Sequence, residues 1–249
     1  MLPIIQIEVP TYPLFVTIGL VFAVLFSYFR IDKAGLTFKE YLILLCICAV
    51  STLVGARVLF VISMIPQMGI SAEGIFYYLL NGGIVFYGGL LGMIFGVFIF
   101  SGVIHKDFCL VIDTLAPAIP LFHIFGRIGC LLAGCCYGIP WEWGVILQDS
   151  SGVIRFPVQI FESFCNALIF AAILLRERKL ESIDGNLKVY LVLYAICRFI
   201  LEFFRGDSIR GIWFVGLSTA QLVSMVIALY YVFMALKRKG SSEVRVDKK

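Results

Sequence analysis

Long runs of apolar residues recur along the chain, separated by short polar segments. Seven runs are long enough for a membrane-spanning helix, which needs roughly 20 apolar residues and accepts about 17 to 25. They cover residues 12–29, 41–62, 84–104, 108–125, 157–175, 188–204 and 213–236. Strands of a membrane barrel are about 10 residues long and alternate in polarity, so these continuous runs favour helices. The pattern predicts an all-α integral membrane protein with seven transmembrane helices.

Composition agrees with this pattern. Of the 249 residues, 61% are apolar and 14% are charged, whereas a soluble domain carries about 25% charged residues. We expect one membrane domain over residues 1–236 and a basic, disordered tail over residues 237–249. The first run lacks a basic leading segment and a small-residue cleavage site, so it is expected to be a retained helix.

Basic residues are unequally distributed between the two sides of the predicted helices. Fourteen of the 20 lysines and arginines follow the first, third, fifth and seventh runs, which places them on one side of the membrane. They are Arg30, Lys33, Lys39, Lys106, Arg176, Arg178, Lys179, Lys188, Lys237, Arg238, Lys239, Arg245, Lys248 and Lys249. The side richer in basic residues is cytoplasmic, so we expect the N-terminus outside and the C-terminus in the cytoplasm.

The other six basic residues are all arginines, and all lie at outer helix ends or in outer loops of this topology. They are Arg57, Arg127, Arg155, Arg198, Arg205 and Arg210. An arginine inside a membrane costs about 2.5 to 3.5 kcal/mol on insertion scales, and its planar fork binds phosphate or carboxylate through two hydrogen bonds. The set favours binding of a phospholipid head group. The alternative is that each arginine pairs with an acid or a helix-end carbonyl and holds the bundle together.

The sixth run carries a polar stripe on an otherwise apolar helix. Its members are spaced four, four and three residues apart: Tyr194, Arg198, Glu202 and Arg205. Residues at this spacing share one helix face. We expect Arg198 to pair with Glu202, which would leave Arg205 to face a ligand. Gln159 and Glu162 in the fifth run are expected to reach the same cavity.

Glycines punctuate the segment 126-GRIGCLLAGCCYGIPWEWGV-145 after the fourth run. Glycine lets the backbone approach a ligand or another helix closely. Non-helical backbone at this depth is tolerated only where it lines an enclosed or wet cavity. We therefore expect an outer-face site loop over residues 126–156 that carries Arg127.

Several of these segments resemble signature sequences of the prolipoprotein diacylglyceryl transferase family. GRIGCLLAGCCYG (126–138) follows the frame of the family's Gly-Arg-x-Gly-Asn and Asn-Gly-Glu signature. FYGGLLG (86–92) resembles its His-Gly-Gly-Leu segment, and RFPVQIFE (155–162) its Arg-His-Pro-x-Gln-x-Tyr-Glu. YAICRFILEFFRGD (194–207), LSTAQLVS (217–224) and TYPLF (11–15) resemble its Tyr-x-x-x-Arg-x-x-x-Glu-Phe-Phe-Arg, Ser-x-x-Gln and first-helix tyrosine segments. The likeness spans nearly the whole chain.

The resemblance implies an enzyme of the bacterial plasma membrane whose active site faces the outer leaflet. Such an enzyme moves the diacylglyceryl group of phosphatidylglycerol onto the lipobox cysteine of a prolipoprotein and releases glycerol phosphate. The implied partners are phosphatidylglycerol, membrane lipid and a prolipoprotein signal peptide, with no nucleic acid, cofactor or metal.

The resemblance and the residue patterns together predict the members of the site. Catalytic roles are assigned to Arg127, Arg198, Tyr87 and Glu202. Substrate-binding roles are assigned to Tyr12, Arg57, Cys130, Cys135, Gly138, Gln159, Glu162, Tyr194 and Arg205.

The chain departs from the family pattern at four positions. Tyr87 and Phe156 replace two histidines, while Cys130 and Cys135 stand in place of the signature Asn and Glu. A phenol with an ordinary pKa of about 10 is a poor general base. The departures indicate a divergent member, and they keep two alternatives open: transfer to an acceptor other than a lipoprotein, or phospholipid binding without catalysis.

Three of the eight cysteines, Cys130, Cys135 and Cys136, lie in the site loop. Their C-x4-CC spacing is not a zinc pattern, and two histidines in the chain are too few to complete one. The alternatives are small residues lining the site, a disulfide from Cys130 to Cys135 or Cys136, and a nucleophilic cysteine that forms a thioether with the lipid. His123 precedes Arg127 by four residues and is either a general base or a structural residue.

Overall fold

The computed structural model describes residues 10–68, 71–146, 152–206 and 217–246, and most of them are helical. Five segments within these ranges are long and apolar enough to cross a membrane. They are Thr11–Tyr28, Phe38–Ile62, Phe86–Ile104, Phe108–Leu132 and Val158–Leu180. This confirms a mostly helical chain with several candidate membrane spans. The sixth run forms a helix of 16 residues, and the apolar part of the seventh covers Ala220–Tyr231.

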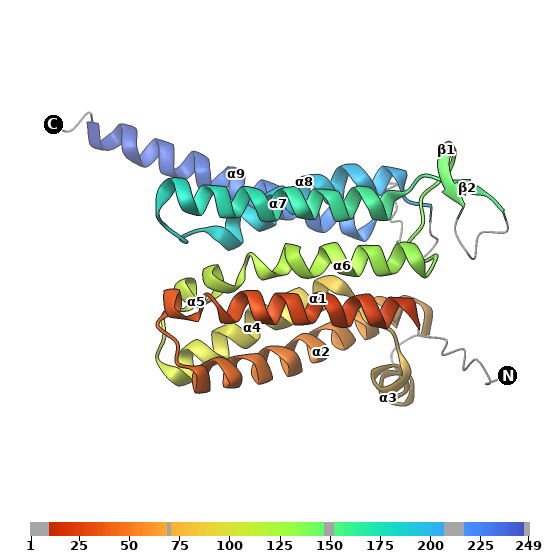
Figure 1. The fold of residues 1–249 in the computed structure, drawn as a ribbon, viewed down its shortest axis with the longest axis horizontal. Helices are drawn as coiled ribbons and strands as arrows, with labels where there is room; N and C mark the ends of the chain where they lie inside the picture. Colours follow the sequence, from red (N-terminus) through yellow and green to blue (C-terminus); the bar gives the residue numbers. More distant parts are fainter. Residues whose placement is uncertain (1–9, 69–70, 147–151, 207–216, 247–249) are drawn as a thin grey trace, which may run out of the picture. The chain divides into compact units, whose positions relative to one another are not determined.

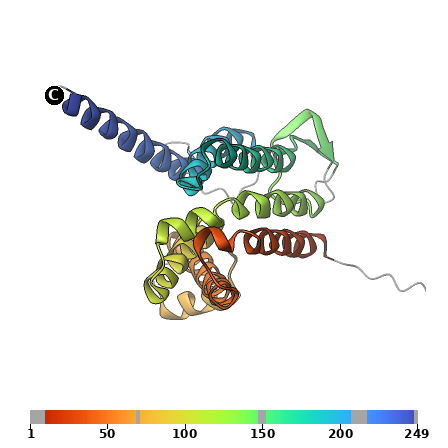
Figure 2. The ribbon, with the colours of Figure 1, turned by 60° about the vertical axis from the view of Figure 1, so that its left-hand side comes forward.

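The chain divides into two compact units, and the first combines Met1–Phe26 with Ala116–Lys249. Its helices are α1 (Thr11–Tyr28), α6 (Ala118–Leu132), α7 (Val158–Leu180), α8 (Asn186–Leu201) and α9 (Thr219–Val246). The 3-10 helix η2 (Glu202–Phe204) continues α8. Helix α7 packs against both α6 and α8, and α8 also packs against α9 (Figures 1 and 2). Helix α1 lies on α6, where the rings of Phe22 and Phe125 stack at 5.0 Å.

The second unit, Ser27–Leu115, contains η1 (Ile31–Ala34), α2 (Phe38–Met68), α3 (Ala72–Asn81), α4 (Phe86–Ile104) and α5 (Phe108–Leu115). Small residues let α2 and α4 approach closely. A Cβ added at Gly92 would lie 2.1 Å from the carbonyl oxygen of Ser51, and one at Gly55 would lie 2.4 Å from that of Gly88. Such contacts hold helices together in lipid, where apolar burial alone gives little preference for a neighbouring helix.

A short hairpin joins α6 to α7. Strand β1 (Pro140–Ile146) pairs antiparallel with β2 (Ile154–Arg155), with Ile146 opposite Ile154 (Figure 1). Just before β1, Gly138 forms a bridge with Arg205. The connection between α6 and α7 is therefore tied by backbone hydrogen bonds to the end of α8 and η2.

The structure corrects three of the expected boundaries. The run 108–125 is divided into α5 and α6 at Pro117, since a proline cannot donate the backbone hydrogen bond that a continuous helix requires. The expected site loop 126–156 begins as helix, because α6 continues to Leu132, and it contains the β1–β2 hairpin. Helix α9 extends to Val246, whereas disorder was expected from residue 237.

Candidate functional site

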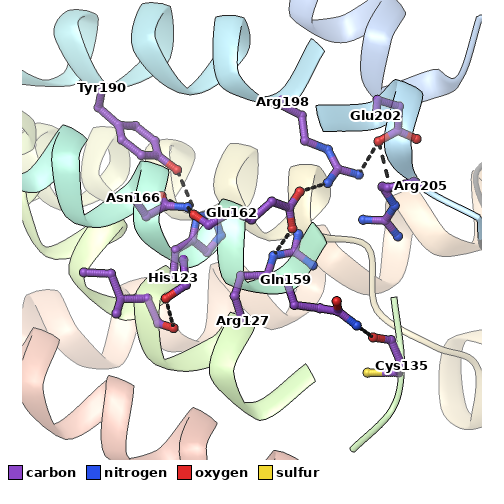
Figure 3. Close-up of polar contacts among 12 residues, drawn as sticks. His123, Arg127, Cys135, Gln159, Glu162, Asn166, Tyr190, Arg198, Glu202 and Arg205 are labelled. Carbon is purple, nitrogen blue, oxygen red and sulfur yellow. Dashed lines mark hydrogen bonds and ion pairs between the residues drawn. The ribbon is translucent and has the colours of Figure 1, made fainter. Parts of the chain in front are cut away.

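Five charged side chains of the first unit form a continuous series of ion pairs (Figure 3). Arg127 Nε on α6 lies 2.6 Å from Glu162 Oε2 on α7. Arg198 on α8 donates to the other oxygen of Glu162, and its Nη2 lies 2.7 Å from Glu202 Oε2. Arg205 Nε lies 3.9 Å from the same Glu202 oxygen. We call these five residues the arginine–glutamate network.

The spacing along α8 explains half of this network. The predicted pair between Arg198 and Glu202 is confirmed, because residues four apart face the same side of a helix. Arg205 is also near Glu202, so the Arg198–Glu202 pair does not leave it without an acidic neighbour, and its role in ligand binding stays a prediction. Arg127, Arg198 and Arg205 thus each have an acidic neighbour, as a purely structural role would require.

Charge and burial nevertheless distinguish the network from a set of balanced structural pairs. The side chains of Glu162 and Glu202 are only 4% and 1% exposed, and Arg127 is the most exposed of the five at 14%. Three guanidiniums face two carboxylates, so the network itself carries one net positive charge. Charges withdrawn from water interact strongly, so this arrangement favours one bound anion.

Three predicted binding residues surround the network. Gln159, one turn before Glu162 on α7, donates to the backbone carbonyl of Cys135 at 2.8 Å. Tyr194 on α8 is buried and accepts a hydrogen bond from Arg127. Tyr12 on α1 lies close enough to interact electrostatically with Arg127. The structure therefore brings residues of four helices to one place.

A second polar cluster lies beside the network and was not predicted from the sequence. His123 Nδ1 lies 3.3 Å from Asn166 Oδ1 and 3.4 Å from the hydroxyl of Tyr190 (Figure 3). Asn166 also donates to the carbonyl of Glu162 at 2.8 Å. The available signal was spacing, because Asn166 follows Glu162 by four residues and Tyr190 precedes Tyr194 by four. These contacts join buried His123 to α7 and α8.

The three loop cysteines are brought together by the way α6 ends. The amide of Cys135 donates to the carbonyl of Cys130 at 3.1 Å, and that of Gly134 donates to Leu131 at 3.2 Å, with Gly134 at φ 69°. This is a Schellman motif, in which the side chains of the first and last residues meet. Cys136 follows with φ 57°, and the sulfur atoms of Cys130, Cys135 and Cys136 all lie within 4.8 Å of one another.

All three thiols are free, so the structure shows no disulfide between these cysteines. Hydrogen bonds from the Cys130 and Cys135 thiols hold the pKa of the Cys136 thiol below its usual range. The Arg127 and Arg205 guanidiniums lower it further by favouring the thiolate. The thiols therefore lie against the same positive charge that the network presents.

The position of a family histidine is occupied by an aromatic cluster. The ring of Phe156 stacks on Phe161 at 4.9 Å and on Phe204 at 4.8 Å, and it meets the edge of Trp141 at 5.8 Å. A Cβ added at Gly138 would lie 2.3 Å from the carbonyl oxygen of Phe156. Gly138 is therefore required for close packing, and Phe156 contributes apolar contact where a histidine would contribute a proton acceptor.

Two of the outer arginines that the structure describes, Arg155 and Arg57, lie outside the network. Arg155 donates to the carbonyl of Gly138 at 3.3 Å and lies over the ring of Tyr137 at 4.2 Å. Arg57 belongs to the second unit, as does Tyr87, and Arg57 donates to the carbonyl of Gly82. Arg210 lies outside the described residues.

Comparison with known proteins agrees with the sequence signatures. The profile of the family described as prolipoprotein diacylglyceryl transferase matches residues 1–237. A phosphatidylglycerol–prolipoprotein diacylglyceryl transferase of Clostridium tetani is 28% identical over 229 residues, which cover 90% of each chain. One of Clostridium perfringens is 29% identical and covers 96% of each, and one of Rickettsia bellii is 27% identical over 95% of this chain. The chain therefore belongs to the prolipoprotein diacylglyceryl transferase family.

Proposed function

We propose that this protein transfers the diacylglyceryl group of phosphatidylglycerol to the cysteine thiol of a prolipoprotein lipobox. Family membership and the names of relatives aligned over nearly their full length support this substrate pair. The thiol loses its proton to solvent, its sulfur forms a bond to the diacylglycerol carbon that carries the phosphate, and the bond from that carbon to the phosphate oxygen breaks. Glycerol phosphate then leaves with the electron pair on its oxygen.

The net positive charge of the arginine–glutamate network is the observation that carries this proposal. A phosphodiester has one negative charge, and three guanidiniums gathered at one place attract it. Arg127, the most exposed of them, contacts the lipid phosphate, while Glu162 and Glu202 hold Arg198 and Arg205 in place behind it. As the carbon–oxygen bond breaks, charge builds on the phosphate, and these fixed guanidiniums stabilise it.

The topology that suits this chemistry has seven spans, with the N-terminus outside and the C-terminus in the cytoplasm of the bacterial plasma membrane. Helices α8 and α9 supply the two spans beyond the five long apolar segments. The bias of lysines and arginines supports the orientation. The network then faces the outer leaflet, where both phosphatidylglycerol and the exported acceptor are available. The roles predicted for Tyr87 and Arg57, which belong to the second unit, stay predictions.

A transfer assay tests the function directly. The full-length protein in detergent is supplied with phosphatidylglycerol and a lipobox peptide, and both glycerol phosphate release and peptide mass are measured. We expect one glycerol phosphate for each lipidated peptide, and neither product with a peptide whose cysteine is replaced by serine. Glycerol phosphate release that requires a different added acceptor would show that the protein modifies a substrate other than a lipoprotein. Bound lipid without release would contradict transferase activity.

A further inference from the structure

The cysteine cluster at the end of α6 offers a ligand set that the arginine–glutamate network does not use. Cys130 lies in the last turn of α6, Cys135 ends its terminal motif, and Cys136 follows with a positive φ. Their three sulfur atoms meet at one place. A disulfide would use two of these thiols and leave the third. A single metal ion would use all three.

We propose that Cys130, Cys135 and Cys136 bind one zinc ion, and that its fourth position is open to the thiol of the acceptor. Zinc–sulfur bonds of about 2.3 Å hold tetrahedral ligands about 3.8 Å apart. The sulfur atoms are already within 4.8 Å of one another, so side-chain rotations that move the sulfur atoms by roughly 1 Å complete the site. Among the described residues no fourth metal-binding side chain joins this group, and three protein ligands with one open position is the arrangement of catalytic zinc.

Neighbouring charges suit such a complex. Zinc with three thiolates carries one negative charge, and the guanidiniums of Arg127 and Arg205 both act on Cys136. The side-chain amide of Gln159 holds the backbone carbonyl of Cys135 at 2.8 Å, which fixes one ligand residue against α7. Contacts of this kind orient the ligands of metal sites.

Zinc would also deprotonate the acceptor thiol, a task for which the family pattern offers histidines that this chain replaces with Tyr87 and Phe156. Thiolate is the attacking form of an acceptor cysteine, and a thiol that binds zinc is deprotonated outright. The proton goes to solvent, the sulfur attacks the glycerol carbon, and glycerol phosphate leaves with the electron pair of the broken bond. The product is a neutral thioether, which binds zinc weakly and is released. This role of the fourth position depends on the proposed transferase function, whereas zinc binding itself does not.

Metal content provides the first test. The full-length protein, purified in detergent under reducing conditions without chelator and loaded with zinc, should hold about one zinc per chain by elemental analysis. Cys130→Ser, Cys135→Ser and Cys136→Ser should each weaken zinc binding at least tenfold. The matched control is the double variant Cys165→Ser/Cys197→Ser, which removes two thiols that also contact each other between α7 and α8. It should keep the zinc.

Cobalt reports on the open position without turnover. The cobalt-loaded protein should show sulfur-to-metal absorption, and a lipobox peptide should change its visible bands, while the Cys→Ser peptide should not. No zinc after loading, copper in place of zinc, a loop disulfide that persists under reduction, or unchanged zinc in all three loop variants would overturn the site. Transfer activity that survives complete removal of zinc would reject the role of the zinc in transfer and leave the transferase intact. Zinc binding without transfer would reject the transferase and leave the metal site.

Discussion

Arg127 and Glu162 join α6 to α7 through an ion pair of 2.6 Å, and the same carboxylate holds Arg198 of α8 through its other oxygen. Glu162 therefore joins Arg127, which is proposed to contact the lipid phosphate, to Arg198 behind it. Because the carboxylate is buried, it positions both guanidiniums, which are then already oriented before an anion arrives. Preorganised charge of this kind is the form in which electrostatic catalysis acts.

Removing Arg127 should abolish most of the activity without unfolding the protein. Arg127→Ala deletes the most exposed guanidinium of the network, so kcat/KM for lipid transfer should fall by about a hundred- to a thousand-fold. The matched control is Arg178→Ala, on the exposed surface near the end of α7, which should leave transfer unchanged. Initial rates at several phosphatidylglycerol concentrations measure the effect. Normal activity of the Arg127 variant would remove it from the site.

Neutralising Glu162 should act on stability as well as on rate. Glu162→Gln keeps the shape of the side chain but leaves Arg127 and Arg198 without their shared carboxylate. Breaking a buried ion pair by removing one partner costs about 3–5 kcal/mol, so the thermal midpoint in detergent should fall clearly. Glu181→Gln, at the exposed end of α7, serves as the control and should leave the midpoint unchanged. Equal thermal midpoints for Glu162→Gln and Glu181→Gln would show that the Glu162 carboxylate does not stabilise the fold.

The turn at Gly138 should not accept a side chain. In Gly138→Ala the new Cβ would lie 2.3 Å from the carbonyl oxygen of Phe156, and a real Cβ does not approach this closely. The hairpin must then move away from η2, so stability and transfer should both decrease. Gly102→Ala on α4 meets nothing within 4 Å and is the control, with a gain of about 0.5–1 kcal/mol expected from helix propensity. Thermal unfolding and the transfer assay on both variants measure these effects, and a Gly138→Ala variant as stable and active as the original protein would contradict the prediction.

Restoring the family's histidine at residue 156 should not restore a general base. The side chain at this position packs against the rings of Phe161 and Phe204, and a polar imidazole among these apolar rings costs more free energy than leucine does. Phe156→His should lower the thermal midpoint more than Phe156→Leu, which keeps an apolar side chain, and should not raise the transfer rate. A faster Phe156→His variant would show that a proton acceptor is missing at this point.

The sequence alone predicted that this is a membrane protein and where most of its helices lie. Apolar runs of about 20 residues have few other stable states in a chain with so little charge, so α1, α2, α4 and α7 fall close to their predicted runs. It also predicted the pair of Arg198 and Glu202, because four residues on one helix are neighbours whatever the rest of the fold does. Signature segments spread along the chain identified the family for the same reason, since short motifs are read without tertiary information.

Only the tertiary structure decided which charges meet between helices. The sequence placed Glu162 near the polar stripe, but its two arginine partners depend on how α6, α7 and α8 pack. The sequence placed the three cysteines in one loop, but only the terminal motif of α6 shows that all three sulfur atoms lie together. Local rules of hydrogen bonding and hydrophobicity specify elements, but ion pairs and ligand sets depend on distances between elements, which packing sets.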